Sequence, residues 1–343
     1  MGLPEFKYIQ PSSIKELSAH LSQHGQHSRL VAGGTDLLIA LKQGLDRPDY
    51  LVDLKSITGL NQISYQKDSG IIIGALTSLR EVGSSPIINT RIPILAQAAN
   101  SVGAIQHRQM GTIGGNLCLP NRCMYYNKSE FWRQARTPCY RVGGEICHVV
   151  NMPAQCHAAY TGDTAPALLA LGARVKIVSA AGERVVDLTE FFTGDALQPN
   201  SLQSSEVITE ILIPEANLND KGVYQKYRHR SAVDFPLAGV AVQAKFQEQT
   251  GNADLFICQE IRVAITGVWT APLRVSKAEE LIRGLAYHEI TPQLTEEFGT
   301  LVSQKAKPVN NLTGSQVQRR RMTKIMARDA LQAILVQYSS ERG

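Results

Sequence analysis

Long apolar runs are absent from this 343-residue sequence. No segment reaches the roughly 18 consecutive apolar residues that a membrane-spanning helix needs. The opening MGLPEFKYIQ also lacks the apolar stretch of a secretory signal. We therefore expect a cytoplasmic protein with no membrane partner. In a reducing compartment, the six cysteines are not expected to form a disulfide framework.

Two common nucleotide-binding signatures are missing as well. No G-x-G-x-x-G follows a predicted strand, and no G-x-x-x-x-G-K-[ST] occurs, which excludes a Rossmann dinucleotide site and a P-loop. The net charge is only +5 and the basic residues are scattered. The nearest basic cluster, Arg319-Arg320-Arg321, is interpreted as a solvated helix face or a subunit contact. No nucleic-acid partner is therefore expected.

The residues that are present favour a packed α+β protein. Hydrophobic residues make up 43% and charged residues 19%, enough for a sizeable core. We expect a small α/β unit over residues 1–56, a second unit over 57–220 and a third over 221–343. The third has strand patterns followed by helix patterns, which favours α+β over a doubly wound sheet. Its expected strands cover 223–228, 238–246 and 261–268, and its expected helices cover 276–283, 293–303 and 315–338.

The second unit contains an unusual segment. Apolar runs predict a buried strand at 70–75, a helix at 94–101 and a hairpin from 173–179 and 184–188. GTIGGN at 111–116 interrupts the pattern. Residues of about 118–158 carry cysteines and aromatic residues but little periodicity. We interpret them as an irregular insertion held by something other than a core.

Two glycine pairs lie about eighty residues apart. The first is in Ala32-Gly33-Gly34-Thr35-Asp36, and the second is in Thr112-Ile113-Gly114-Gly115-Asn116. Paired glycines permit positive φ and let a ligand approach the main chain closely. Their exposed N–H groups form a concavity suited to a pyrophosphate. Two hairpin or cap turns would explain the same pattern.

Four cysteines fall within 34 residues with the spacing C-x15-C-x7-C-x8-C: Cys123, Cys139, Cys147 and Cys156. Four thiolates bind either tetrahedral zinc or an iron–sulfur cube. The spacing contains neither the CxxC pairs usual for zinc nor the ferredoxin run. An iron–sulfur cluster, a zinc clamp and free thiols all remain open on the residues alone.

Several motifs resemble the FAD-binding subunits of molybdenum hydroxylases, which include xanthine dehydrogenases and aerobic carbon monoxide dehydrogenases. They are AGGTDLL at 32–38, TIGGN at 112–116, TGDTAPAL at 161–168, KYRHRSAVDFPLAGVAV at 226–242 and VAITGV at 263–268. The resemblance covers essentially the whole chain. It implies a two-subdomain FAD-binding fold of the PCMH, or vanillyl-alcohol-oxidase-like, type. A C-terminal α+β domain with an antiparallel sheet and helices follows that fold.

The resemblance also implies the FAD contacts. The first glycine motif would wrap the pyrophosphate and the second would form the opposite wall. Thr77 would touch the adenine–ribose side, Asp163 the ribose or adenosine, and Ile208 and Lys226 the flavin end. Where the family has QIRN, this chain has Gln106-His107-Arg108-Gln109. The implied set is Ala32, Gly33, Gly34, Thr35, Asp36, Leu37, Thr77, Thr112, Ile113, Gly114, Gly115, Asn116, Asp163, Ile208 and Lys226.

The insertion narrows the resemblance to the β subunits of 4-hydroxybenzoyl-CoA reductases, in which such a segment holds a 4Fe–4S cluster. Carried over by position, Cys123, Cys139, Cys147 and Cys156 are its ligands, and Cys118 and Cys258 are packing thiols. No residue of this chain is expected to be catalytic toward the substrate. The implied role is to pass electrons from reduced ferredoxin through the 4Fe–4S cluster and FAD to partner subunits. Those partners are a small 2Fe–2S subunit and a large molybdenum–pterin subunit, which together form a dimer of αβγ heterotrimers.

Two other functions remain open at this point. The chain is also compatible with the FAD subunit of a xanthine, aldehyde or CO dehydrogenase-type hydroxylase that passes electrons outward to NAD or another acceptor. A third interpretation is a zinc-clamped assembly subunit without a redox role. The cysteine insertion argues against the hydroxylase-type subunit, and the intact glycine motifs argue against the zinc-clamped assembly subunit.

Overall fold

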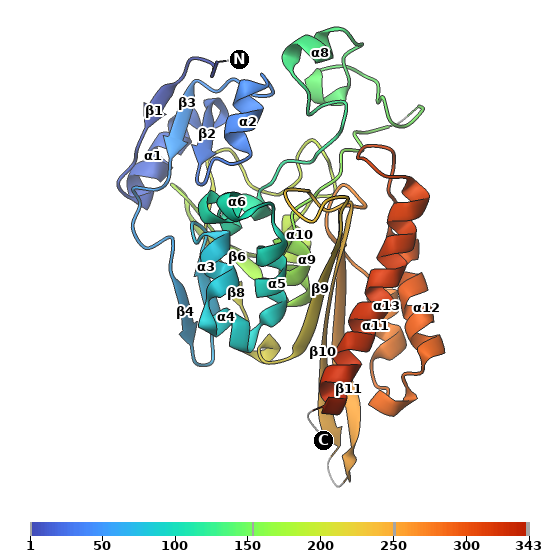
Figure 1. Cartoon of the computed structure of the whole chain (residues 1–343). Coiled ribbons are helices and arrows are strands. Elements are labelled where there is room, and N and C mark those ends of the chain that lie inside the picture. Colours follow the sequence, from blue (N-terminus) through green and yellow to red (C-terminus); the bar gives the residue numbers. More distant parts are fainter. Residues whose placement is uncertain (1, 153, 250–251, 341–343) are drawn as a thin grey trace.

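The computed structural model describes residues 2–152, 154–249 and 252–340, and these contain three successive β-sheets. The first is parallel, and the other two are antiparallel. Helices separate the sheets and cover their faces (Figure 1). This arrangement confirms the α+β class expected from the sequence. Within the described ranges, no helix is both long and apolar enough to cross a membrane.

The N-terminal unit is a three-stranded parallel sheet in the order β1-β3-β2. Helix α1 begins where Ser13 Oγ accepts the backbone N–H of Glu16, and it buries Leu17 and Leu21 beside the sheet. Strand β2 ends directly before the first glycine motif. The elements are β1 (Lys7–Ile9), α1 (Ile14–His24), β2 (Ser28–Val31), α2 (Leu37–Lys42) and β3 (Tyr50–Asp53).

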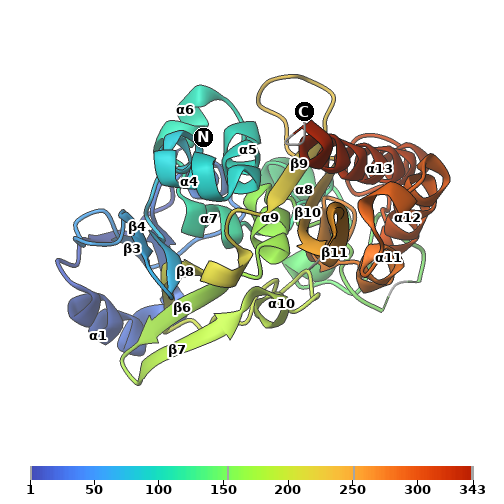
Figure 2. The same cartoon turned by 90° about the horizontal axis from the view of Figure 1, so that it is seen from below.

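The second sheet has the order β4-β5-β8-β6-β7. Ile71 and Ile73 of its β5 strand are fully buried and pack with apolar residues of α5 and α9 in one hydrophobic cluster. Seen from below, α5 and α9 lie on one side of strands β8, β6 and β7 (Figure 2). The elements are β4 (Ile63–Gln66), β5 (Gly70–Gly74), α3 (Leu79–Ser84), α4 (Pro86–Arg91), α5 (Pro93–Ser101), α6 (Ile105–Met110), α7 (Ile113–Leu117), α9 (Thr164–Ala170), β6 (Arg174–Ser179), β7 (Gly182–Asp187), α10 (Leu188–Phe191) and β8 (Val207–Ile213).

The expected irregular segment is confirmed. Between α7 and α9 its described residues form only the short helix α8 (Glu130–Gln134) and one 3-10 turn (Tyr140–Val142). The segment lies at the same end of the molecule as α2 (Figure 1). Backbone bonds tie it there, because Glu130 N donates to Gln43 O at 3.0 Å.

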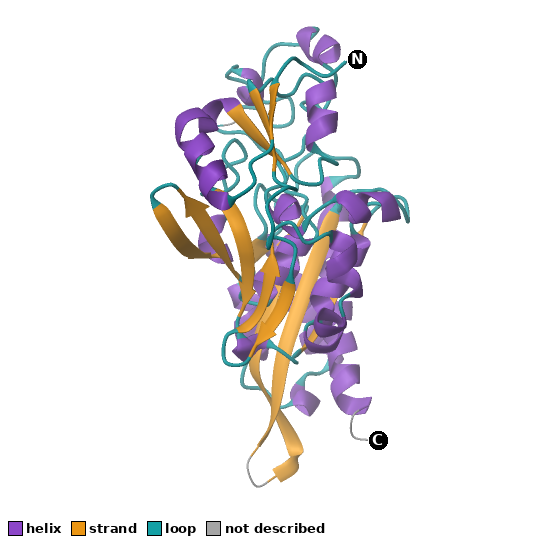
Figure 3. Ribbon diagram, turned by 90° about the vertical axis from the view of Figure 1, so that its left-hand side faces the viewer, coloured by secondary structure: helices purple, strands orange, loops and turns teal. Residues whose placement is uncertain are grey.

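The C-terminal sheet has the order β12-β11-β10-β9 and is buried on both faces. Val240 and Val242 pack beneath the C-terminal helices, whereas Ala241 and Ala264 join the cluster of α5 and α9. The β10–β11 hairpin extends beyond the rest of the fold (Figure 3). The elements are β9 (Lys221–Tyr227), β10 (Ala238–Gln249), β11 (Asn252–Thr266), β12 (Leu273–Arg274), α11 (Ser276–Ile282), α12 (Pro292–Lys305) and α13 (Gln316–Ser340).

The second glycine motif is not the break in regular structure that its sequence predicts. Thr112 caps the short helix α7, since its Oγ1 accepts the backbone N–H of Gly115 at 3.1 Å. Packing against α9 and β8 overrides the low helix propensity of the two glycines. Helix α6 just before it was also not predicted.

The expectation that Arg319 lies on a solvated helix face is wrong. Its side chain is fully buried, and its guanidinium donates to the carbonyl oxygens of Leu237, Val309 and Gly267 and to Asn311 Oδ1. Burial lowers the pKa of Arg319 to about 10. The neighbouring Arg320 and Arg321 are exposed.

Candidate functional site

A large cleft lies where the N-terminal unit, the second unit, the insertion and the C-terminal domain meet. It encloses about 2120 Å³ of space, including open solvent at its mouth. Both glycine motifs contribute to its wall. The lining segments include 29–37, 111–112, 115–116, 118–122, 126–127 and 233–235, together with Arg141, Thr161 and Asp163.

The first glycine motif forms one wall by direct backbone contact. A Cβ placed on Gly33 would overlap the carbonyl oxygen of Met110. Gly34 has φ +69°, a conformation that L side chains rarely adopt. Only glycine at these two positions therefore lets the loop follow its path beside the second motif while exposing main-chain N–H groups.

The second motif is split between the cleft and the core behind it. Thr112, Gly115 and Asn116 line the cleft. Gly114 N instead donates to Ala75 O at 2.9 Å, and Ile113 is fully buried. The Asn116 side chain accepts the backbone N–H of Thr164 at 3.1 Å and the hydroxyl of the same residue at 2.7 Å. The motif therefore joins α7 to α9 at the base of the cleft.

Asp163 lies at the cleft wall as part of a buried polar group. Its carboxylate accepts Tyr224 OH at 2.6 Å and Lys226 Nζ at 3.0 Å, and Lys226 Nζ also donates to Ser101 O at 2.9 Å. Burial raises the pKa of Asp163 and lowers that of Lys226, while their mutual attraction opposes both shifts. The pair fixes the start of α9 against β9.

Several residues of the implied FAD set do not themselves line the cleft. Ile208 lies within β8 in the hydrophobic core, and Lys226 stands behind Asp163. Thr77 is fully buried beside the second motif, where Ile113 N donates to its carbonyl oxygen at 3.0 Å.

Two arginines of the insertion also line the cleft, and sequence reasoning missed both. Arg122 donates to Asp36 Oδ1 at 2.7 Å and stacks over the Phe235 ring at 4.0 Å, which joins the insertion to the first motif and to the C-terminal domain. Arg141 reaches the cleft from farther along the insertion. Their closeness to cysteines in the sequence gave no signal of this placement.

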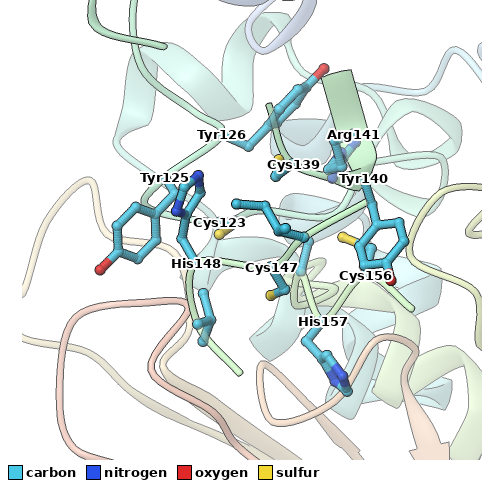
Figure 4. A pocket seen from close by; sticks show the side chains of 13 residues that line it. Cys123, Tyr125, Tyr126, Cys139, Tyr140, Arg141, Cys147, His148, Cys156 and His157 are labelled. Carbon is cyan, nitrogen blue, oxygen red and sulfur yellow. The ribbon is translucent and has the colours of Figure 1, made fainter. Parts of the chain in front are cut away.

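The four clustered cysteines line a second, smaller cavity inside the insertion, which spans about 330 Å³ including open solvent at its mouth. Cys123, Cys139, Cys147 and Cys156 all contribute to its lining (Figure 4). Their chain segments are held by backbone bonds, with Tyr140 N donating to Ile146 O at 3.1 Å. We refer to this space as the sulfur cavity.

Burial raises the pKa of the Cys123 and Cys156 thiols, and the Arg141 charge acts on Cys156 in the opposite direction. The other two cysteines lie elsewhere. Cys118 lines the cleft and Cys258 lies in the C-terminal core, and burial raises the pKa of each thiol to about 12. Both are therefore thiols rather than thiolates near neutral pH.

Residues 4–216 match the family described as "FAD binding domain in molybdopterin dehydrogenase". The chain belongs to this family. Residues 223–334 match the "CO dehydrogenase flavoprotein C-terminal domain". The chain is therefore an FAD-binding medium subunit of the molybdenum hydroxylase and CO dehydrogenase family.

Relatives match along almost the whole chain. The glyceraldehyde dehydrogenase medium chain of Sulfolobus acidocaldarius is 28% identical over 333 residues, covering 96% of this chain and 99% of the relative. The carbon monoxide dehydrogenase medium chain of Hydrogenophaga pseudoflava is 28% identical over 331 residues, covering 96% and 97%. A solved structure of the latter organism's carbon monoxide dehydrogenase superposes with a TM-score of 0.77 at 26% identity, covering 98% of this chain and 99% of that chain.

Unpartnered polar atoms support the fit of FAD in the cleft. Among the described residues, the buried hydroxyls of Thr161 and Thr77 find no hydrogen-bond partner, and Thr161 lines the cleft. Buried polar groups usually have partners, so a polar ligand group is the natural partner of Thr161. His107, which stands at the second position of the family's QIRN motif, also lines the cleft, while Arg108 donates to Val102 O at 2.9 Å.

We predict that Gly33→Ala loses most of its bound FAD. The added methyl group overlaps Met110 O and forces the glycine motifs apart, at a cost of about 2 kcal/mol or more. The measurement is the FAD-to-protein ratio after gel filtration, with circular dichroism to check the fold. Gly2→Ala, whose Cβ would meet nothing within 4 Å, is the control. A full FAD complement in Gly33→Ala would contradict the role of this contact.

Proposed function

We propose that the chain is the electron-transfer subunit of a molybdenum-dependent enzyme of the 4-hydroxybenzoyl-CoA reductase type. In this role it holds FAD and a 4Fe–4S cluster and carries electrons from reduced ferredoxin toward 2Fe–2S and molybdenum subunits. The enzyme removes the ring hydroxyl of 4-hydroxybenzoyl-CoA and gives benzoyl-CoA. The observation that carries the proposal is the set of four cysteines around one cavity beside the FAD cleft.

FAD is proposed to lie along the two glycine motifs. The motif Ala32–Leu37 presents main-chain N–H groups toward its pyrophosphate, Thr112–Asn116 forms the opposite wall, and Asp163 faces a sugar hydroxyl. Thr77, Ile208 and Lys226 support this wall from behind it. When bound, FAD accepts electrons singly or in pairs, whereas an iron–sulfur centre exchanges one at a time.

The sulfur cavity has the donor set of an iron–sulfur cube. A single zinc ion would need its four thiolates to converge at about 2.3 Å from one point. Within the described parts of the chain, no three His, Cys, Asp or Glu side chains converge closely enough to hold one metal ion. A cubane keeps its cysteines apart because irons and sulfides lie between them. The spread of Cys123, Cys139, Cys147 and Cys156 therefore supports a cluster over zinc.

The partners are proposed from the family. The relatives are named medium chains of dehydrogenases, which supports assembly with a small 2Fe–2S subunit and a large molybdenum–pterin subunit. We extend this to a dimer of αβγ heterotrimers with ferredoxin as the donor. The substrate site then lies on the large subunit, and no residue of this chain is proposed to act as an acid or base on the substrate.

A second candidate function is favoured by the names of the relatives. They act as glyceraldehyde and carbon monoxide dehydrogenases, so a hydroxylase-type complex that delivers electrons outward to NAD or another acceptor is the alternative. The FAD cleft serves both functions equally well. The sulfur cavity is the feature that separates them.

The anaerobically purified chain is expected to contain about one FAD, four iron and four acid-labile sulfide, with little zinc. Iron and zinc are measured by elemental analysis and sulfide by colorimetry. Zinc without sulfide would refute the cluster and would favour a clamp that has only a structural role.

Cys139→Ser is expected to lose the iron, the sulfide and the paramagnetic signal of the reduced cluster. Its FAD content stays near that of the unaltered chain, because the glycine motifs lie outside the insertion. Cys118→Ala is the matched control, since Cys118 lies in the cleft rather than in the sulfur cavity, and it keeps the full iron content. Loss of iron in both variants would show that the ligand set is wrong.

The complete complex is expected to reduce 4-hydroxybenzoyl-CoA to benzoyl-CoA with reduced ferredoxin or a reduced viologen as donor. Product formation is followed by chromatography under anaerobic conditions. The same preparation should show little NAD reduction with aldehydes or carbon monoxide. The opposite pattern would identify the hydroxylase-type function instead.

A further inference from the structure

The sulfur cavity and the FAD cleft are adjacent, and two side chains line both of them. These are Tyr126 and Arg141. Tyr126 lies next to Arg141 at the upper side of the sulfur cavity in Figure 4. All other described residues that line one of these two spaces line only that one.

Arg141 is held in place on two sides. Its Nη1 donates to the carbonyl oxygen of Asn121, and its guanidinium lies 4.2 Å from the centre of the Tyr126 ring. Asn121 is itself fixed, because its Nδ2 donates to Ala158 O at 2.9 Å and to Thr270 O at 2.7 Å. The positive charge of Arg141 is therefore confined between the two spaces.

The other charged side chains of the cleft are mostly neutralised by ion pairs. Asp36 is paired with Arg122, Asp163 with Lys226, Arg29 with Asp46 and Asp234 with Arg230. Arg141, in contrast, has no carboxylate partner among the described residues. Its charge thus adds a net positive potential to both the cleft and the sulfur cavity.

Such a charge acts on both cofactors of the proposed function. The pyrophosphate of FAD is an anion, and a confined cation attracts it more strongly than a solvated one. A 4Fe–4S cluster becomes more negative by one charge on reduction, and net charge near a cluster sets its reduction potential. A fixed cation therefore favours the reduced cluster.

We propose that Arg141 is an electrostatic binding residue shared by the two cofactor sites, strengthening FAD binding and raising the reduction potential of the cluster. For its cluster half, this inference rests on the proposed function. The part that concerns FAD binding does not need the cluster, because it rests only on family membership and on the position of Arg141 in the cleft.

The test compares Arg141→Met with the unaltered anaerobic complex. We expect FAD to bind about tenfold more weakly, which corresponds to the loss of one charge-assisted contact. FAD binding is measured by titrating deflavinated protein, and the cluster potential by potentiometric titration followed by paramagnetic resonance. The potential of the cluster is expected to move to a more negative value.

Arg141→Lys separates charge from packing. It keeps a cation between the two spaces but cannot stack as a planar guanidinium. We expect the cluster potential of this variant to stay near that of the unaltered protein. It also serves as the test if Arg141→Met fails to fold, because a cluster potential well below that of the unaltered protein, with a cation still in place, would overturn the electrostatic role.

Arg136→Met is the matched control within the insertion. Arg136 is exposed, stacks 4.4 Å from the centre of the Trp132 ring and lines neither space. It should leave FAD affinity and cluster potential unchanged. Equal effects in Arg136→Met and Arg141→Met would overturn the shared role of Arg141 but not the proposed function. The same holds if Arg141→Met weakens FAD binding and leaves the cluster potential unchanged. Unaltered protein without iron and sulfide would overturn the proposed function and the shared role together.

Discussion

Contact between the main chain of the first glycine motif and that of Met110 and Gly111, directly before the second motif, is the constraint on which the large cleft depends. Gly33 leaves no room for a Cβ beside Met110 O, and Gly114 packs in the same way on Ala75. The Gly33 contact sets how far apart the two walls of the cleft stand, and the Gly114 contact seats the second motif on the core behind the cleft. Both glycines are thus required by the packing of the protein itself.

Local patterns predicted much of the fold because they are carried by neighbouring residues. The hairpin expected at 173–179 and 184–188 is observed at Arg174–Ser179 and Gly182–Asp187, where alternation and a short turn suffice. The helices of the C-terminal domain were predicted within a few residues for the same reason. Helix α7 was missed because packing on α9 and β8 stabilises it, and no local pattern reports such packing.

The same distinction applies to charged side chains. The sequence shows three successive arginines, and only the fold reveals that Arg319 is surrounded by carbonyl oxygens from three other segments. The glycine motifs did predict residues that line the large cleft, and the cysteine spacing predicted four thiols that lie around one cavity. Arg122 could not be assigned to the cleft in advance, because Asp36, its partner, lies 86 positions away in the chain.

The wall of the FAD cleft joins segments that are far apart in the sequence. Asn121 is held by Thr270, 149 residues later, and the cleft is closed by Phe235 from the C-terminal domain. A ribosome must therefore release at least the first strands of that domain before this pocket exists. The complete pocket therefore exists only after most of the polypeptide has been synthesised, because residues far apart in the chain must meet to form it.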